Sequence, residues 1–275
     1  MTGNILDRPR VMGIVNVTPD SFSDGGRLVG AEAAIAHGLR LVEAGADILD
    51  IGGESTRPGA STVGIDEELA RVAPVIHGLR AGWPGSISID TRKPEVARAA
   101  MAAGATIWND VSALTHAPDS AAVAAELGCT VILMHMRGDP QTMQGLADYR
   151  DAVAEVTAEL LERAEAAMAS GVARGRIWLD PGIGFSKTAG HNLALTAGLQ
   201  RLTALGFPIV YGASRKRTIE AVDVTATDPA DRMGGSLALA LEAARRGAAV
   251  IRVHDVRETV QALKLQAAVA GAIIP

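Results

Sequence analysis

Asparagine and aspartate residues stand at the ends of short apolar runs along this chain of 275 residues. Asp90, Asn109 and Asp180 each close such a run. Their side chains can accept or donate hydrogen bonds around a planar heterocycle, and an ionised carboxylate pairs well with an edge that carries two N–H donors. The three residues therefore indicate a site for a nitrogen-rich ring.

Basic side chains occupy the same kind of position near the end of the chain. Arg252 and His254 lie two residues apart in the run "AVIRVH", so both point to one side of a strand. With the amide of Asn16, which follows the run "VMGIV", they could hold a phosphate or a pyrophosphate. An ion pair inside the fold is the alternative for Arg252.

Two polar segments directly follow apolar runs. "NVTPDSFSDGG" (16–26) contains Asp24, and "GESTRPGA" (53–60) carries Thr56 and Arg57. The second segment is too long and too rich in glycine and proline for a minimal strand-to-helix turn, and such segments are typical of active-site loops. An ordinary surface turn is the alternative for it.

Sulfur and histidine side chains offer weaker candidates. Cys129 precedes an apolar run without an evident activating base, which indicates a structural role. In "LMHM" (133–136), Met134 can face a ligand while His135 faces the wall. No HxxxH or CxxC spacing occurs, so a metal held tightly by protein side chains is not expected, whereas Mg²⁺ brought in by a pyrophosphate is compatible with the sequence.

Eight β-prone runs alternate with alanine-rich segments of helical spacing. Strands with two apolar faces, each followed by a helix, predict a parallel sheet covered by helices. Eight such units favour a single-domain (β/α)8 TIM barrel over residues 1–275, with a doubly wound α/β fold as the alternative. The runs are 11–17, 47–52, 86–90, 106–110, 130–135, 176–180, 208–214 and 249–254, and the helical segments include 30–45, 151–171 and 234–247.

A barrel would gather these scattered polar residues at one place, because all its strands end at one rim, where active sites are built. A helix N-cap is the alternative for any single aspartate, but caps do not account for the basic residues at the same rim. The sequence therefore predicts one polar pocket. Its strand-end residues are Asn16, Asp50, Asp90, Asn109, His135, Asp180, Ser214 and His254, with Arg252 and Lys216 close by.

Charge and composition argue against several classes of partner. The net charge is −5 and the pI is about 5.7, without basic stripes or aromatic platforms, so neither a nucleic-acid binder nor a membrane-surface binder is expected. No apolar run approaches the roughly 20 residues of a membrane helix, and the first residues lack the apolar core of a signal peptide. With a lone cysteine, these features predict a cytoplasmic location.

Eight segments distributed along the chain resemble the dihydropteroate synthases, the folate-pathway enzymes that sulfonamides target. The resemblance implies a barrel enzyme that joins 6-hydroxymethyl-7,8-dihydropterin diphosphate to 4-aminobenzoate, releasing pyrophosphate and forming 7,8-dihydropteroate. The segments are, in order, "NVTPDSFSDGG" (16–26), "GGESTRPGA" (52–60), "SIDT" (88–91), "ND" (109–110), "LMHM" (133–136), "DPGIGFSKT" (180–188), "GASRKR" (212–217) and "RVHDV" (252–256).

The resemblance also implies a role for individual residues and a homodimeric state. The pterin would be bound by Asp90, Asn109, Met134, Asp180 and Lys216. The diphosphate would be held by Asn16, Arg252 and His254, with Mg²⁺ bound at Asn16. The aminobenzoate would be surrounded by Phe22, Thr56, Arg57, Phe185, Ser214 and Arg217. The catalytic residues would be Asp24, Lys216, Arg252 and His254.

Two other functions are compatible with parts of this pattern. Pterin-binding methyltransferases that use a corrinoid partner share the barrel and the Asp/Asn/Asp set, but they require neither "SRK" nor the first polar segment. A noncatalytic pterin-binding paralogue is the second alternative. Its support is the stretch after Lys216, where Arg217, Thr218, Ile219 and Glu220 replace the aromatic or aliphatic pair and glycine that are usual in the family.

Overall fold

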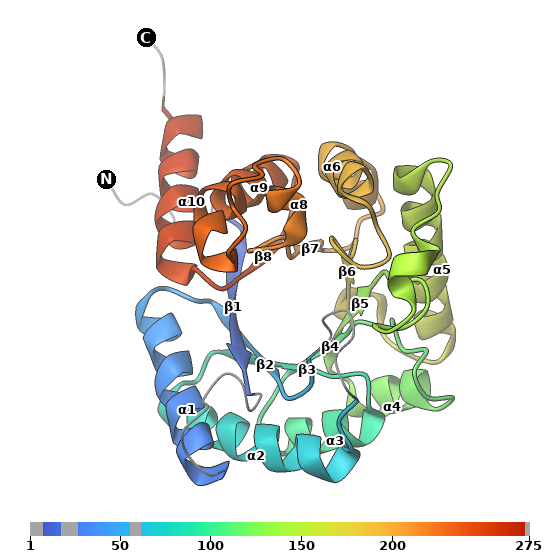
Figure 1. The fold of residues 1–275 in the computed structure, drawn as a ribbon. Coiled ribbons are helices and arrows are strands. Elements are labelled where there is room, and N and C mark those ends of the chain that lie inside the picture. The colour runs from blue at the N-terminus through green and yellow to red at the C-terminus, as the bar shows by residue number, and fades with distance from the viewer. Residues whose placement is uncertain (1–7, 18–26, 56–61, 273–275) are drawn as a thin grey trace.

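The computed structural model describes residues 8–17, 27–55 and 62–272. Its centre is a barrel of eight parallel strands, and helices surround it (Figure 1). Each strand falls within or beside a predicted run, so the predicted (β/α)8 barrel is confirmed. The strands are β1 (Arg10–Asn16), β2 (Ile48–Gly52), β3 (Ser86–Asp90), β4 (Ile107–Asp110), β5 (Thr130–Met134), β6 (Ile177–Asp180), β7 (Val210–Tyr211) and β8 (Val250–Val253).

Helices follow the strands and pack on their outer faces. The predicted helical segments 30–45, 151–171 and 234–247 fall on α1, α5 and α9. Local capping explains where α5 begins, because Asp151 Oδ1 accepts hydrogen bonds from the N–H groups of Val153 and Ala154, both at 3.0 Å. The helices are α1 (Arg27–Glu43), α2 (Ile65–Gly82), α3 (Pro94–Ala102), α4 (Ser120–Leu127), α5 (Ala152–Ala169), α6 (Ala189–Ala197), α7 (Leu199–Thr203), α8 (Arg217–Glu220), α9 (Met233–Arg245) and α10 (Val256–Ala270).

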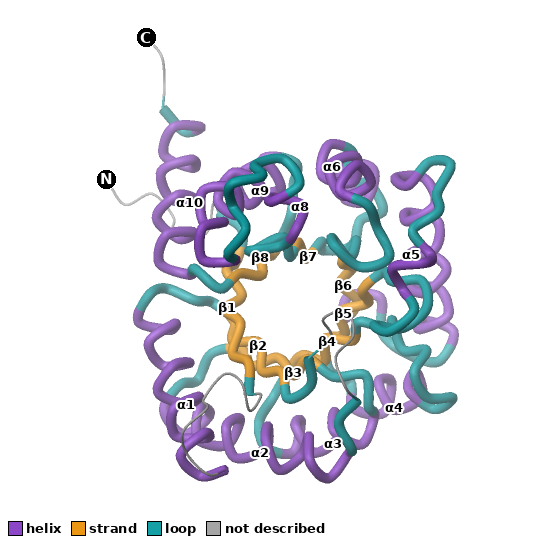
Figure 2. Tube along the Cα trace, viewed as in Figure 1, coloured by secondary structure: helices purple, strands orange, loops and turns teal. Residues whose placement is uncertain are grey.

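The strands close on themselves, which rules out the doubly wound alternative. β1 pairs with both β2 and β8, so the first and last strands lie side by side (Figure 2). The remaining junction, between β6 and β7, is formed by a single bridge between Leu179 and Ile209. β7 is shorter than its predicted run because the chain turns after it, where Lys216 N donates to Ala213 O at 3.3 Å and Arg215 has a φ of 59°.

Apolar side chains form two separate layers, one on each face of the barrel wall. The outer layer lies between strands and helices and includes Leu49, Ile51 and Leu133. The inner layer fills one end of the barrel. At this end the Arg10 guanidinium lies 4.4 Å from the ring centroid of Trp178. The inner layer consists of Met12, Ile48, Ile107, Ile132, Trp178, Val210 and Val250.

Strand alternation then carries polar side chains into the barrel interior. Side chains two residues apart on a strand share a face, so the residue two positions after an inner-layer residue also faces inward. The polar residues at these second positions are Asp50 on β2, Asn109 on β4, Asp180 on β6 and Arg252 on β8, and Met134 on β5 lies among them. The barrel is therefore apolar at one end and polar at the carboxyl ends of its strands. No helix in the described part of the chain is long and apolar enough to cross a membrane.

The inner layer gives a stability prediction at Ile132, which is fully buried. Ile132→Ala should lower the free energy of unfolding by about 2–5 kcal/mol, because it removes buried methyl groups and leaves a cavity. Urea denaturation followed by circular dichroism measures the change. Val224→Ala is the matched control, since Val224 is 77% exposed and its truncation should change stability by about 0.5 kcal/mol or less. Equal losses in both variants would contradict the assignment of Ile132 to a packed layer.

Candidate functional site

Arg252 lies at the centre of the polar end of the barrel. Its Nε donates to Asp50 Oδ2 at 2.6 Å, and its Nη2 donates to Asp90 Oδ2 at 2.6 Å. Asn109 Nδ2 donates to the same Asp50 oxygen at 3.1 Å. Strands β2, β3, β4 and β8 are thus joined by one charged network, and the ion pair considered for Arg252 is present.

Asp50 has no predicted role beyond its place at a strand end, yet it is the most deeply buried member of this network. Its side chain has no exposed surface, compared with 15% for Asp90 and 21% for Arg252. The sequence signal that could have identified it is strand alternation, because Asp50 follows Ile48 by two positions as Arg252 follows Val250. The sequence placed Asp50 at the predicted pocket but did not identify it as the partner of Arg252.

Burial makes it unfavourable to ionise all the carboxyl groups at this end of the barrel. Burial raises the pKa of Asp90 to about 7, and the negative charge of Asp50 adds to this effect, while Arg252 opposes it. Burial also raises the pKa of Asp180, opposed first by Lys216. Burial therefore opposes ionisation of both carboxyl groups, and the cations beside them favour it.

Asp180 begins a tight segment at the end of β6. Its Oδ1 accepts a hydrogen bond from Gly182 N at 2.7 Å. Gly182 has a φ of +66°, and a Cβ atom there would lie 2.0 Å from the carbonyl oxygen of His135. Only glycine fits this approach, so the "DPGIG" sequence allows the segment to cross closely over the end of β5.

Lys216 and Phe185 meet beside this segment. The Lys216 ammonium donates to the carbonyl oxygen of Ile183 and lies 4.6 Å from the ring centroid of Phe185. Burial lowers the pKa of Lys216 to about 8, and Asp180 opposes this shift. The structure therefore brings together a cation, an aromatic ring and the Asp180 carboxylate.

Ser214 and His254 form a second polar contact at the same end of the barrel. Ser214 Oγ and His254 Nδ1 are 3.0 Å apart, and the His254 N–H donates to the same hydroxyl at 3.2 Å. Arg215 and Asp255, the residues that follow them, form an ion pair with a shortest distance of 2.5 Å. The turn after β7 is thus tied to the end of β8.

Other predicted residues are placed less centrally. Asn16 is exposed at the end of β1, and Arg217 is exposed at the start of α8. The altered stretch after Lys216 forms this short helix, in which Ile219 is buried and Thr218 Oγ1 accepts a hydrogen bond from Asn192 Nδ2 at 2.9 Å. Four predicted residues lie outside the described residues: Phe22, Asp24, Thr56 and Arg57.

The side chains of "LMHM" separate as expected. Met134 is buried on the inward-facing side of β5, whereas the His135 ring lies in the wall, with Nε2 2.9 Å from Glu159 Oε2. Cys129 is also buried, and burial raises the pKa of its thiol to about 11, which agrees with a structural role.

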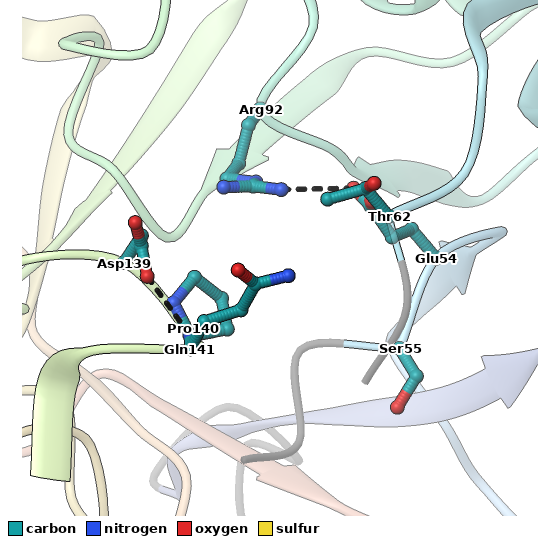
Figure 3. A pocket seen from close by; sticks show the side chains of 7 residues that line it. All are labelled: Glu54, Ser55, Thr62, Arg92, Asp139, Pro140 and Gln141. Atoms are coloured by element: carbon teal, nitrogen blue, oxygen red, sulfur yellow. Dashed lines mark hydrogen bonds and ion pairs between the residues drawn. The ribbon is translucent and has the colours of Figure 1, made fainter. Parts of the chain in front are cut away.

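A small pocket is lined by described residues other than those of the Arg252 network. Arg92 and Glu54 form an ion pair at 3.4 Å in its wall (Figure 3). Lys93 also binds Glu54, at 3.0 Å. Among the residues that the structure describes, none of those predicted to bind the pterin or the diphosphate lines this pocket. Its lining residues are Glu54, Ser55, Thr62, Arg92, Asp139, Pro140 and Gln141.

The donor set at the rim suits hydrogen bonding better than tight metal coordination. Among the residues that the structure describes, no three or more histidine, cysteine, aspartate or glutamate side chains are grouped so that they could hold a metal ion. The exposed amide of Asn16 is a hard oxygen donor by itself. A metal at this rim would need most of its oxygen ligands from another source.

The chain is similar in sequence and structure to proteins of known activity. Residues 12–254 match the family described as "Pterin binding enzyme". Dihydropteroate synthase from Escherichia coli (strain K12) is 45% identical over 260 residues, which is 94% of this chain and 91% of that protein.

Solved structures agree with this match. Xanthomonas albilineans dihydropteroate synthase with 4-aminobenzoic acid is 53% identical with a TM-score of 0.91, over 98% of this chain and 95% of that one. A structure from the same organism in complex with 7,8-dihydropteroate is 50% identical with a TM-score of 0.87, over 98% of this chain and 96% of that one. The likeness thus spans every strand of the barrel.

The carboxylate network predicts how Asp90 titrates in a variant. Asp50→Asn should lower the pKa of Asp90 below about 7, because a negative neighbour is lost and Arg252 is left to pair with Asp90. Nuclear magnetic resonance of ¹³Cγ-labelled aspartate, recorded as a function of pH, measures the shift. Asp66→Asn, in the exposed first turn of α2, is the control and should leave the pKa of Asp90 unchanged. An Asp90 pKa that stays the same or rises in Asp50→Asn would show that the two carboxylates do not interact as described.

Proposed function

The chain belongs to the dihydropteroate synthase family of pterin-binding enzymes, and we propose that the family's reaction takes place around Arg252. The protein is a transferase that condenses 6-hydroxymethyl-7,8-dihydropterin diphosphate with 4-aminobenzoate. The products are 7,8-dihydropteroate and pyrophosphate. The observation that carries the proposed location is the convergence of carboxylates, an amide and a lysine at one end of the barrel.

The pterin is assigned to the inward-facing polar residues. The Asp180 carboxylate accepts paired N–H groups of the pterin, since each oxygen has two lone pairs and only one contact, from Gly182 N, is used within the segment. Asn109 and Asp90 provide further acceptors and donors, and Met134 lines the pocket. Lys216, which already bridges to Ile183, provides a cation beside the same ring.

The diphosphate is assigned to the groups at the outer edge of the same site. Arg252 uses Nε and Nη2 for its carboxylate contacts, and a guanidinium has five N–H donors, so donors remain for an oxyanion. His254 and Asn16 complete the set. As the bond to the diphosphate breaks, these donors stabilise the negative charge that develops on the leaving group.

The second substrate requires little activation. An aromatic amine is neutral near pH 7 and carries a lone pair, so the demanding step is departure of the diphosphate. The positive charge left on the pterin is stabilised by the carboxylates assigned to the pterin site. Asp24 is assigned the same role. The aminobenzoate is assigned to Phe22, Thr56, Arg57, Phe185, Ser214 and Arg217. Of these, Phe185 lies beside the Lys216 ammonium, and Ser214 contacts His254.

Magnesium fits this site as a companion of the diphosphate. Mg²⁺ prefers oxygen ligands and usually keeps several waters with one or two protein donors, which agrees with a single exposed amide at Asn16. We propose that Asn16 holds the ion with the diphosphate oxygens. A bound Mg²⁺ would neutralise charge on the leaving group.

A homodimer and a cytoplasmic location are part of the proposal. Two apolar side chains on α10 support a dimer, since Leu265 is 66% exposed and Val269 is 68% exposed. The single cysteine in the sequence, buried as a free thiol, agrees with a reducing compartment.

The activity is tested by incubating the purified protein with dihydropterin diphosphate and 4-aminobenzoate, with Mg²⁺ or with EDTA, and detecting dihydropteroate by mass spectrometry. We expect product with Mg²⁺ and a large loss with EDTA. Lys216→Ala should fold but turn over poorly, because the cation between the two substrates is lost. Absence of product from folded wild-type protein would refute the activity. Near-normal turnover by Lys216→Ala would refute the role of Lys216.

The pterin assignment predicts the effect of Asp180→Asn. The substitution keeps the shape of the side chain but removes its charge and one acceptor, which costs about 1.5–3 kcal/mol for a charge-assisted hydrogen bond. The dissociation constant of 6-hydroxymethylpterin, measured by isothermal titration calorimetry, should therefore rise by roughly ten- to a hundredfold. Asp66→Asn is again the control. Wild-type affinity in Asp180→Asn would place the pterin elsewhere.

A further inference from the structure

Lys187 is a buried cation that the proposed chemistry does not use. Lys187 is only 5% exposed and lies at the end of the segment formed by residues 180–187. Its Nζ lies 2.9 Å from His135 Nδ1, 2.9 Å from Phe185 O and 3.3 Å from His135 O. An ammonium has three N–H donors, so these three acceptors can use all of them.

The surroundings of Lys187 are consistent with an ammonium. His135 Nδ1 can accept from Lys187 when the proton of the imidazole is on Nε2, and Nε2 then donates to Glu159 at 2.9 Å. Burial lowers the pKa of His135, which keeps the imidazole neutral. Burial also lowers the pKa of Lys187 to about 7, so an ammonium is costly here and its three acceptors offset the cost.

Lys187 holds the segment that crosses the end of β5. His135 N donates to Asp180 O at 2.9 Å, and Arg137 N donates to Ser186 Oγ at 2.9 Å. In addition to these two hydrogen bonds, the Lys187 ammonium binds the carbonyl oxygens of both His135 and Phe185. Both ends of segment 180–187 are therefore hydrogen-bonded to residues 135–137, which directly follow β5.

The same segment contacts Lys216 on its other side. The carbonyl oxygen of Ile183 accepts from the Lys216 ammonium, and the Phe185 ring lies 4.6 Å from that ammonium. The Phe185 carbonyl, in contrast, binds Lys187. One residue thus links the buried lysine to the lysine that faces the substrates.

We propose that Lys187 is a positioning residue of the pterin site: by fastening residues 180–187 to the end of β5, it sets the places of the Asp180 carboxylate, the Phe185 ring and the Lys216 ammonium. This inference rests on the proposed function. Lys187 itself contacts no substrate and acts through the segment. Its loss leaves the His135 carbonyl, the Phe185 carbonyl and an imidazole nitrogen without this donor, and the segment must shift to satisfy them.

The test measures pterin binding and steady-state kinetics in Lys187→Met and Lys187→Gln. The methionine variant keeps the apolar stem and removes all three donors, whereas the glutamine variant keeps two N–H donors for the carbonyl groups. In Lys187→Met, the dissociation constant of 6-hydroxymethylpterin should rise by about ten- to a hundredfold, with a comparable fall in kcat/KM for the pterin diphosphate. Lys187→Gln should show a smaller loss in the same direction.

The control separates positioning from stability. Val156→Ala removes buried methyl groups from α5, at a residue that is fully buried and outside the segment, so it should destabilise the protein without changing pterin affinity. Titration calorimetry uses folded protein of each variant, checked by thermal melting, and Lys187→Gln provides the comparison if Lys187→Met does not fold. Pterin affinity within about twofold of wild type in the folded Lys187 variants would overturn the proposal, as would an equal loss in Val156→Ala.

The kinetics also distinguish this inference from the proposed function. Wild-type protein that makes no dihydropteroate would refute the function itself. Wild-type protein that makes it, together with Lys187 variants of unchanged kcat/KM, would refute only the role of Lys187.

Discussion

The contact of Arg252 with Asp50 and Asp90 is the constraint on which the polar end of the barrel depends. The three residues are far apart in sequence, since Arg252 is 202 positions from Asp50 and 162 from Asp90. A fully buried carboxylate such as Asp50 is costly unless it is paired and hydrogen-bonded. Strands β2, β3 and β8 must therefore keep a register that places these groups together. Buried ion pairs add little net stability, but a wrong register would leave a buried charge alone.

The inner apolar layer makes this arrangement possible. Met12, Ile48, Trp178 and their neighbours exclude water from one end of the barrel, so the polar residues two positions further along each strand lie in a confined space. Confinement raises the pKa of Asp90 to about 7 and lowers that of Lys216 to about 8. The charges at the site are thus held by one another rather than by solvent.

The backbone of the segment after β6 approaches the residues after β5 closely, and this contact fixes one side of the polar end of the barrel. Gly182 passes so near to the His135 carbonyl that no side chain fits, and Lys187 binds that same carbonyl. The segment after β6 is therefore fixed by backbone and buried side-chain contacts within the protein. Precise placement of this kind is what catalysis by orientation requires.

The sequence by itself determined the alternating strands and helices, the barrel and the rim at which the polar residues meet. It could do so because strand and helix periods, and the convergence of parallel strand ends, are local and topological properties. Asp90, Asn109 and Asp180 could be identified as strand-end residues of the polar pocket because each closes an apolar run. The segments around them that resemble the family also support this placement. The short helix after Lys216 and the short length of β7 could not be predicted, because both depend on how the turn after β7 packs.

Only the tertiary structure decided which side chains pair. Asp50 as the partner of Arg252, the neutral His135 between Glu159 and Lys187, and the Phe185 ring beside Lys216 join residues that are distant in the chain. Their pKa shifts follow from burial and from neighbouring charges, and neither can be read from residue type. The physical reason is that electrostatic energies depend on distances and on exclusion of water, which exist only once the barrel has closed.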